Sequence, residues 1–148
     1  MSDRFADLSP FIAIIWITFV IAVSVLYRRR AGKPVFPQVP EDALFAEHWA
    51  SGMFASNCLL VAITPNSISV VPRFPFNLMF LPEIYRLERI IPTASVSAVW
   101  RIKGIVGNNV AFTYGPDQRT LRLRLSKPDK FMETLRPLVP PTASWRVS

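Results

Sequence analysis

The chain is poor in the residues that carry most enzyme chemistry: it has one cysteine and one histidine among 148 residues. A lone Cys58 cannot form an intramolecular disulfide, which suits a reducing compartment such as the cytoplasm. With His48 as the only histidine, the chain has too few ligands for the usual His and Cys type of metal site. The sequence therefore predicts neither a metal site nor another cofactor.

Catalytic patterns are also missing. His48 has no Asp, Ser or Cys motif arranged around it, and a general base needs a nucleophile beside it. Cys58 precedes an apolar run, so we expect a small buried hydrophobic side chain rather than a nucleophile. We predict a protein that is not an enzyme and has no small-molecule substrate.

The net charge of +7 invites comparison with nucleic-acid-binding proteins. However, the chain lacks a glycine-rich phosphate loop, a zinc-knuckle spacing and a basic run with interleaved aromatics. Arg28, Arg29 and Arg30 form the one tight basic cluster, and the other basic residues are scattered. We therefore expect no nucleic-acid partner.

Charge is absent from residues 8–27, LSPFIAIIWITFVIAVSVLY. At about 1.5 Å of rise per residue this segment forms a helix about 30 Å long, the thickness of a bilayer's hydrocarbon core. A cleaved signal peptide is the first alternative, but Asp3 and Asp7 precede the apolar run and the arginines follow it, which is the reverse of a signal peptide. A buried core helix is the second alternative, but only Thr18 and Ser24 interrupt the apolar surface after residue 11. We predict a transmembrane helix over 8–27.

Charge asymmetry gives the orientation of this helix. Arg4 stands alone before the span, whereas the arginine cluster and Lys33 follow it, so the positive-inside rule places the C-terminal side in the cytoplasm. We therefore expect a single-pass protein of a bacterial inner membrane with its N-terminus outside. The predicted membrane anchor consists of Phe11, Trp16, Phe19, Tyr27, Arg28, Arg29 and Arg30.

The rest of the chain divides by composition. Residues 1–7 form a short N-terminal segment, and residues 28–43 form a basic and then proline-rich linker that we expect to hold the next domain at a distance from the membrane. Residues 44–138 suffice for one small domain with one core. Residues 139–148 contain two adjacent prolines and are expected to form a flexible tail, with docking of Trp145 as the alternative.

Alternating apolar residues predict strands in the domain. Residues 59–64 and 67–71 flank Pro65 and Asn66, which is typical of a β-hairpin. Residues 94–102 lead through a glycine and two asparagines into 110–114, which predicts a second hairpin. In 119–125 the leucines alternate with polar residues, as in a strand with one buried face.

After these strands the spacing of the apolar residues changes from every second residue to every third or fourth. Phe131, Leu135 and Leu138 are spaced as on one face of a helix, and Pro128 suits the first helical position. Ser126 is a candidate helix cap three residues before Asp129. We predict a short amphipathic helix that closes the domain.

Together, the hairpin LVAITPNSISVV, the segment IIPTASVSAV, the hairpin NNVAFTYGPDQRTLRLRL and the helix SKPDKFMETL resemble bacterial pleckstrin-homology-like (PH-like) domains. The resemblance covers residues 44–138. It implies a mainly β fold: a strongly bent antiparallel barrel of about seven strands, with one end plugged by the C-terminal helix. The first hairpin region, 45–59, contains no Lys or Arg, so the phosphoinositide recognition of eukaryotic members is not expected here.

The connection 73–89, RFPFNLMFLPEIYRLER, is the best functional candidate in the domain because it is too apolar for an idle surface loop. Its apolar residues either fold back over the core or form an exposed patch that meets a partner or the membrane, and the two are not exclusive. The candidate contact residues are Arg73, Phe74, Phe76, Leu78, Met79, Phe80, Leu81, Tyr85 and Arg86.

These features favour an interaction or scaffolding module, an accessory subunit or assembly partner whose partner is an integral membrane protein. The alternative is a lipid-sensing module in which the juxtamembrane arginines, with Arg122 and Arg124, bind anionic headgroups. A third possibility makes the helix itself the active element, with Trp16, Ala13, Ala22 and Ser24 packing on another span.

Overall fold

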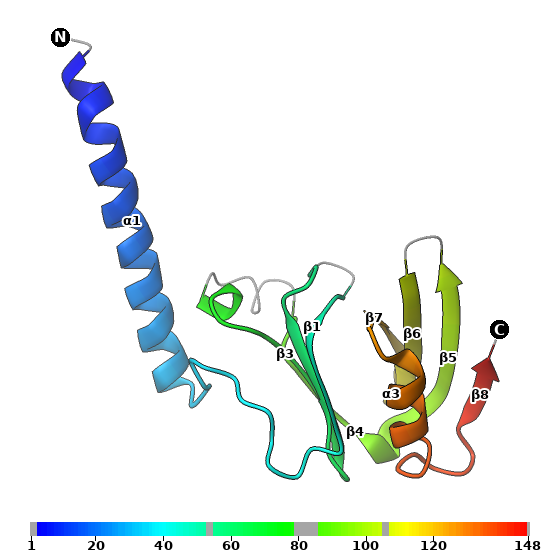
Figure 1. Ribbon diagram of the computed structural model, residues 1–148. Helices are drawn as coiled ribbons and strands as arrows, with labels where there is room; N and C mark the ends of the chain where they lie inside the picture. The colour runs from blue at the N-terminus through cyan, green and yellow to red at the C-terminus, as the bar shows by residue number, and fades with distance from the viewer. Residues whose placement is uncertain (1–2, 53–54, 79–85, 105–106, 148) are drawn as a thin grey trace.

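The computed structural model describes residues 3–52, 55–78, 86–104 and 107–147, and consists of a long N-terminal helix beside a β domain (Figure 1). Helix α1 comprises Asp3–Arg30. Its segment Pro10–Arg30 is long and apolar enough to cross a membrane. A signal sequence near the N-terminus passes the same test of length and composition.

Within the described residues, the domain contains two four-stranded sheets with the orders β1-β2-β3-β4 and β7-β6-β5-β8. The strands are β1 Phe45–Ala50, β2 Leu59–Ile63, β3 Ser67–Pro72, β4 Arg89–Pro92, β5 Val96–Gly104, β6 Gly107–Tyr114, β7 Arg119–Arg124 and β8 Ser144–Val147. Short 3-10 helices η1 Phe76–Leu78 and η2 Thr93–Ser95 follow β3 and β4, and helix α3 is Pro128–Leu135. The predicted mainly β domain is therefore confirmed, and α3 follows β7, although the strand β8 comes after it.

Both predicted hairpins are confirmed. β2 and β3 pair antiparallel around the turn at Pro65 and Asn66, with Ile63 opposite Ile68. β5 and β6 pair antiparallel over most of their length, and β7 follows on the other side of β6. In β3 buried residues alternate with half-buried ones, because the side chains of successive residues point to opposite faces of a sheet, whereas all five residues of β2 are buried.

The expected barrel is not present: the two sheets do not close on each other. They meet at one corner, where Ser51 and Arg124 form an isolated antiparallel bridge with N···O distances of 3.1 and 2.8 Å. At the other side β4 leads through η2 into β5, and the free edge of β5 is occupied by β8. Because β8 takes the edge that β4 would need, closure through a β4–β5 pair is blocked.

The C-terminal tail differs from the expectation of a flexible segment. β8 pairs with β5 in parallel, with Trp145 opposite Val99. Val139 and Ala143 are buried in the core, and Trp145 packs against it. The tail is held because its apolar side chains cover an edge of the second sheet.

Helix α3 contributes Phe131 and Leu135 to the core, and it begins with Pro128 at its first turn as predicted. The prediction that Ser126 caps this helix is wrong, because Lys127 occupies the cap position. The side chain of Lys127 makes no cap hydrogen bond. Instead the buried carboxylate of Glu47 on β1 accepts the backbone N–H groups of Ser126 at 2.5 Å and Lys127 at 3.1 Å. This contact satisfies donors that a helix start leaves open.

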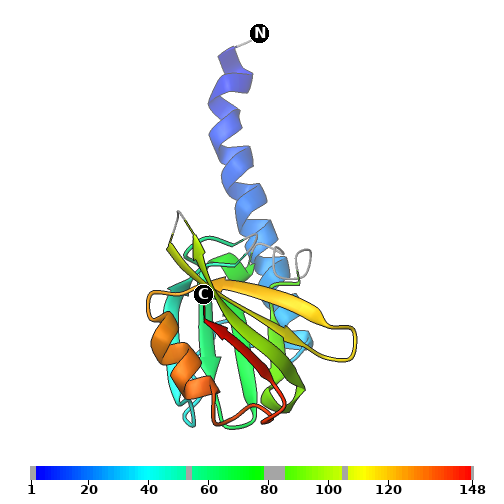
Figure 2. The same cartoon turned by 90° about the vertical axis from the view of Figure 1, so that its right-hand side faces the viewer.

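The C-terminal half of α1 lies beside the domain, and its N-terminal half projects beyond it (Figures 1 and 2). The helix ends at Arg30, and Gly32 two residues later has a φ of +67°, the left-handed conformation that favours glycine. The N–H of Lys33 donates to the carbonyl of Arg28 at 2.9 Å. The chain turns there and continues through 31–43 to β1.

Replacing Trp145 by alanine should lower the free energy of unfolding by about 1–3 kcal/mol, because it removes a partly buried aromatic side chain from the core. The matched control is Arg146→Ala on the same strand, an exposed position that should change stability by less than about 0.5 kcal/mol. Thermal unfolding of both variants measures the difference. Equal melting curves would show that the tail contributes nothing to the fold.

Candidate functional site

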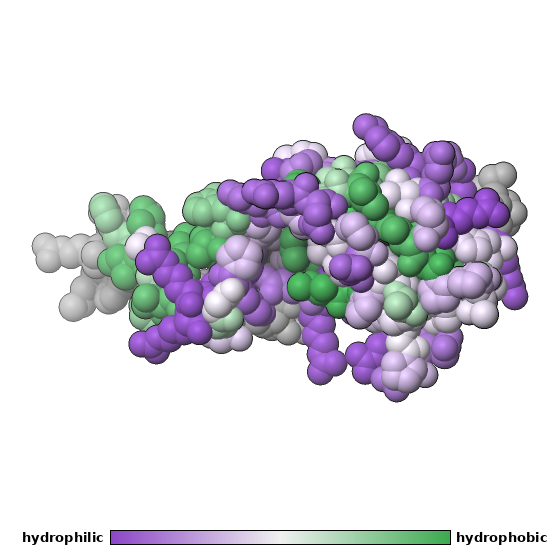
Figure 3. Space-filling view, turned by 90° about the horizontal axis from the view of Figure 1, so that it is seen from below, coloured by the Kyte–Doolittle hydropathy of each residue, from purple (hydrophilic) through white to green (hydrophobic). Residues whose placement is uncertain are grey.

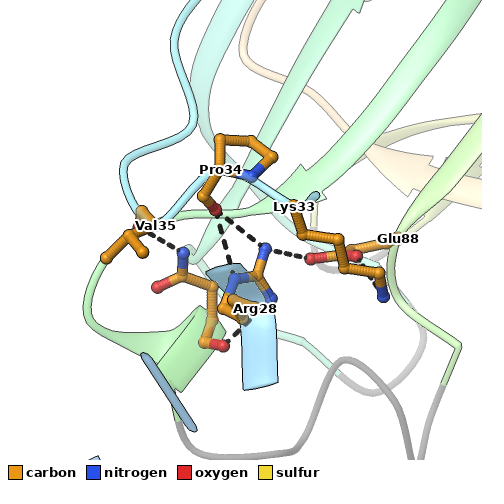
Figure 4. A network of polar contacts seen from close by, with 6 residues as sticks. Arg28, Lys33, Pro34, Val35 and Glu88 are labelled. Atoms are coloured by element: carbon orange, nitrogen blue, oxygen red, sulfur yellow. Dashed lines mark hydrogen bonds and ion pairs between the residues drawn. The ribbon is translucent and has the colours of Figure 1, made fainter. Parts of the chain in front are cut away.

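The candidate site is the junction between α1 and the β domain, and Arg28 is its centre. Arg28 is only 1% exposed although it comes from the last turn of the apolar helix. Its Nε and Nη2 both donate to the carbonyl of Pro34 at 3.1 Å, and its Nη1 donates to the carbonyl of Asn77 at 3.2 Å (Figure 4). Nη2 also forms an ion pair with Glu88. The buried guanidinium is therefore bonded to the linker, to η1 and to the segment before β4.

A second layer of contacts ties the linker to the same place. Lys33 Nζ lies 2.9 Å from the second carboxylate oxygen of Glu88, and Asn77 Nδ2 donates to the carbonyl of Val35 at 2.6 Å. The ring of Phe36 lies 4.9 Å from that of Phe74, measured between centroids. The linker therefore does not act as the expected spacer, because it is bonded to the domain directly after the helix ends.

The pKa of Glu88 is lowered by its two basic neighbours, so this carboxyl is charged at neutral pH. Burial alone raises the pKa of this carboxyl, but hydrogen bonds and charges from Lys33 and Arg28 more than offset it and lower the pKa below its usual 4.5. A carboxyl with a depressed pKa stabilises the folded arrangement above its ordinary pKa and loses that contribution as the pH falls through the lowered value. The ion pairs therefore hold the junction throughout the physiological pH range.

An apolar groove lies beside this network. It has a volume of about 780 Å³ and is lined from α1 and from the domain together. Its lining residues are Trp16, Ile17, Val20, Ile21, Val25, Arg29, Val35, Phe36, Phe74, Pro75 and Leu78. Arg29 is the one charged residue among them. The groove suits an apolar occupant.

A polar recess of about 700 Å³ lies near the other side of the helix end. It is lined by Tyr27, Lys33, Arg86, Glu88, Arg89, Tyr114 and Arg119. Arg89 donates to the hydroxyl of Tyr114 at 2.9 Å and to the carbonyl of Arg86 at 3.0 Å, so its guanidinium is held in place. Among the described lining residues, four are cationic and one is acidic, which gives the recess an excess of positive charge.

The predicted anchor residues separate into two groups. Phe11, Trp16, Phe19 and Tyr27 are exposed on α1, as are Arg29 and Arg30. Arg28 instead points into the domain.

The predicted contact residues of 73–89 also separate. Leu78 is buried and lines the groove, whereas Phe74 and Phe76 remain exposed, so the described part of this connection contains both buried and exposed apolar residues. Contact of the exposed ones with a partner or the membrane stays a prediction. Arg73 stacks on Trp49, with its Cζ 4.1 Å from the ring centroid, and Arg86 lines the recess. Met79, Phe80, Leu81 and Tyr85 lie outside the described residues.

Sequence reasoning missed Glu88, Asn77 and Lys33 as parts of the site. Glu88 lies 60 positions after Arg28, and no local pattern marks the two as partners. Of the other titratable candidates, Cys58 is buried, which raises the pKa of its thiol, and His48 is exposed on β1. Across the described part of the chain, no group of three or more His, Cys, Asp or Glu residues is placed to hold a metal ion.

No family model matches the chain, and a comparison with curated proteins found no match either.

Replacing Glu88 by glutamine should weaken the docking of the helix on the domain by about 2–3 kcal/mol, because it leaves the buried Arg28 without its anionic partner. Protease cleavage within 31–43 measures this, since the linker becomes accessible when the junction opens. The control is Glu133→Gln, which removes an exposed carboxylate from α3. The linker of wild-type protein should become more cleavable as the pH falls below about 4.5, and this step should be missing in Glu88→Gln. Cleavage unchanged by Glu88→Gln would contradict the role of the ion pair.

Proposed function

We propose that the chain is a non-enzymatic, single-pass membrane protein that presents a PH-like domain on the cytoplasmic side of a bacterial inner membrane. It works as an interaction or scaffolding module, an accessory subunit or assembly partner of a larger membrane complex. The charge asymmetry around the span supports the orientation, with the N-terminus outside. The order of two hairpins, a further strand and a closing helix supports the PH-like assignment.

One observation carries the proposal: the apolar groove is formed by the membrane-type helix and the β domain together. An enzyme or a soluble-ligand receptor has no need for such a composite surface, whereas a partner that spans the same membrane meets both walls at once. Its apolar lining suits a segment of an integral membrane protein, because helices in a bilayer associate by close packing of their surfaces. The Arg28 network supports the same proposal, since it keeps the two walls in one arrangement.

The buried ion pair favours specificity over stability. Taking a charge out of water costs several kcal/mol, which the attraction to the opposite charge roughly offsets. Replacement of the pair by apolar residues is often neutral or stabilising in proteins, so stability alone is a weak reason for having it. The hydrogen bonds of the buried guanidinium do, however, form in only one arrangement of the helix on the domain. A scaffold that must present a composite surface needs this property.

The alternative function, an anionic-lipid sensor, is favoured by the basic recess at the end of α1. It places Lys33, Arg86, Arg89 and Arg119 around one space beside the helix terminus, where headgroup phosphates would lie. Arg122 and Arg124, which the sequence suggested for this role, are not among its described lining residues.

Full-length tagged protein purified in mild detergent should carry a stoichiometric membrane partner, identified by mass spectrometry. Recovery of that partner should fall at least tenfold in the double variant Phe36→Ser, Phe74→Ser, which removes two exposed aromatic side chains from the groove. The matched control is Ile90→Ser, which removes an even more exposed apolar side chain from β4 outside the groove.

Two results would contradict this proposal. A protein that purifies alone has no partner to scaffold, and a partner retained by the groove variant binds elsewhere. If the lone protein instead retains anionic phospholipid and loses it in Arg86→Gln, Arg89→Gln, the lipid-sensing alternative replaces the scaffold.

A further inference from the structure

The way α1 is fixed to the domain has a consequence for the depth of the domain in the membrane. The Arg28 network joins the helix end to η1, and the groove above it is lined by α1 residues back to Trp16. From Arg28 to Trp16 the helix rises about 18 Å. Ser24, one turn before Arg28, is buried as well. Parts of the domain therefore lie alongside residues that belong to the membrane-spanning segment.

Four residues around the groove and η1 are aromatic and exposed. Phe36, Phe74 and Phe76 are 63%, 47% and 38% exposed, and Trp49 is 57% exposed. We call these four residues the aromatic rim. The contact between the rings of Phe36 and Phe74 and the stacking of Arg73 on Trp49 connect the rim to the chain around η1.

The opposite end of the first sheet has a different character. Exposed Pro65 and Asn66 form the β2–β3 turn there, and exposed Glu41 and Asp42 lie in the linker just before β1. Figure 3, which views the molecule from below, shows hydrophilic side chains over much of this end, with smaller apolar areas among them. The polarity of the surface thus changes along the direction of α1.

From these observations we infer that the aromatic rim is immersed in the cytoplasmic leaflet of the membrane that α1 crosses. The inference rests on the proposed function, because it takes α1 as the spanning helix. The partner of this surface is the lipid itself: acyl chains around the phenylalanine rings, and the headgroup boundary around Trp49 and Arg73. Tryptophan and arginine are suited to that boundary because each joins an apolar body to a polar end.

The backbone around η1 is compatible with such a place. Irregular backbone in an apolar medium requires that its polar groups be bonded within the protein. The N–H groups of Arg73, Asn77 and Leu78 donate to the carbonyls of Cys58, Arg73 and Pro75 at 2.8, 3.1 and 2.9 Å. Pro75 has no N–H, and the carbonyl of Asn77 accepts from Arg28. These bonds satisfy a part of the irregular backbone within the protein, as a place at the boundary between headgroups and acyl chains requires.

Immersion also explains how an apolar groove remains open on a protein surface. At leaflet depth the apolar lining of the groove is solvated by acyl chains rather than by water. The domain is then a monotopic contact added to a single-pass anchor, and a partner reaches the groove through the leaflet.

Spin labelling of the full-length chain in lipid nanodiscs tests the inference. Single cysteines are placed at Trp16, Phe76 and Asn66 in a Cys58→Ala background, and collisions of each label with oxygen and with a water-soluble nickel chelate are compared. Phe76 follows β3 and Asn66 precedes it, so the two labels are separated by the length of that strand, roughly 20 Å. The ratio of oxygen to nickel collisions should be several-fold higher at Trp16 and Phe76 than at Asn66.

The outcomes distinguish a failure of the immersed aromatic rim from a failure of the membrane-spanning helix. A label at Phe76 that is as accessible to nickel as the one at Asn66, with Trp16 in lipid, overturns the immersion and leaves the spanning helix intact. A label at Phe76 that neither reagent reaches indicates contact with protein and also overturns it. A Trp16 label accessible to nickel overturns the membrane-spanning helix itself, and with it the proposed function.

Discussion

A buried positive charge at the end of an apolar helix is the constraint on which this structure depends. Arg28 is removed from solvent, and a buried guanidinium is stable only when its donors and its charge are all matched. Three separate segments supply the partners: Pro34 in the linker, Asn77 in η1 and Glu88 before β4. Because these partners come from different parts of the chain, the linker, the connection after β3 and the helix are all fixed relative to one another. The groove and the level of the aromatic rim follow from this arrangement.

Much of the fold could be predicted from local pattern, and the reasons are physical. The alternation of Leu121, Leu123 and Leu125 with polar residues defines β7, and Pro65-Asn66 defines the β2–β3 turn, because each signal is contained in a few consecutive residues. The open sheets, the parallel strand β8 and the Arg28–Glu88 pair depend on contacts between residues far apart in sequence. A run of arginines after an apolar helix is usually explained by topology alone, so the docking role of Arg28 had no signal of its own.

The junction fixes the position of both the linker 31–43 and the apolar connection 73–89 relative to the helix. A free proline-rich linker would let the domain take many positions relative to the helix, whereas here the backbone of Pro34 and Val35 is bonded to Arg28 and Asn77. Under the proposed function, residues such as Phe74 and Phe76 stay exposed without a cost in solubility, because the helix holds them at the membrane. Under the proposed function, lipid contact and partner binding are successive uses of one side of the molecule: the leaflet solvates the rim, and a membrane partner approaches the groove from within it.

The distance between labels on α1 and on the domain is the most direct test of this account. Nitroxides at Ile12 on the exposed helix surface and at Ile90 on β4 report the relation between the two parts by pulsed electron resonance in nanodiscs. The account predicts one narrow distance distribution that broadens in Glu88→Gln, because the ion pair holds the helix on the domain. A broad distribution in the wild-type protein, as expected of a domain on a free linker, would contradict it.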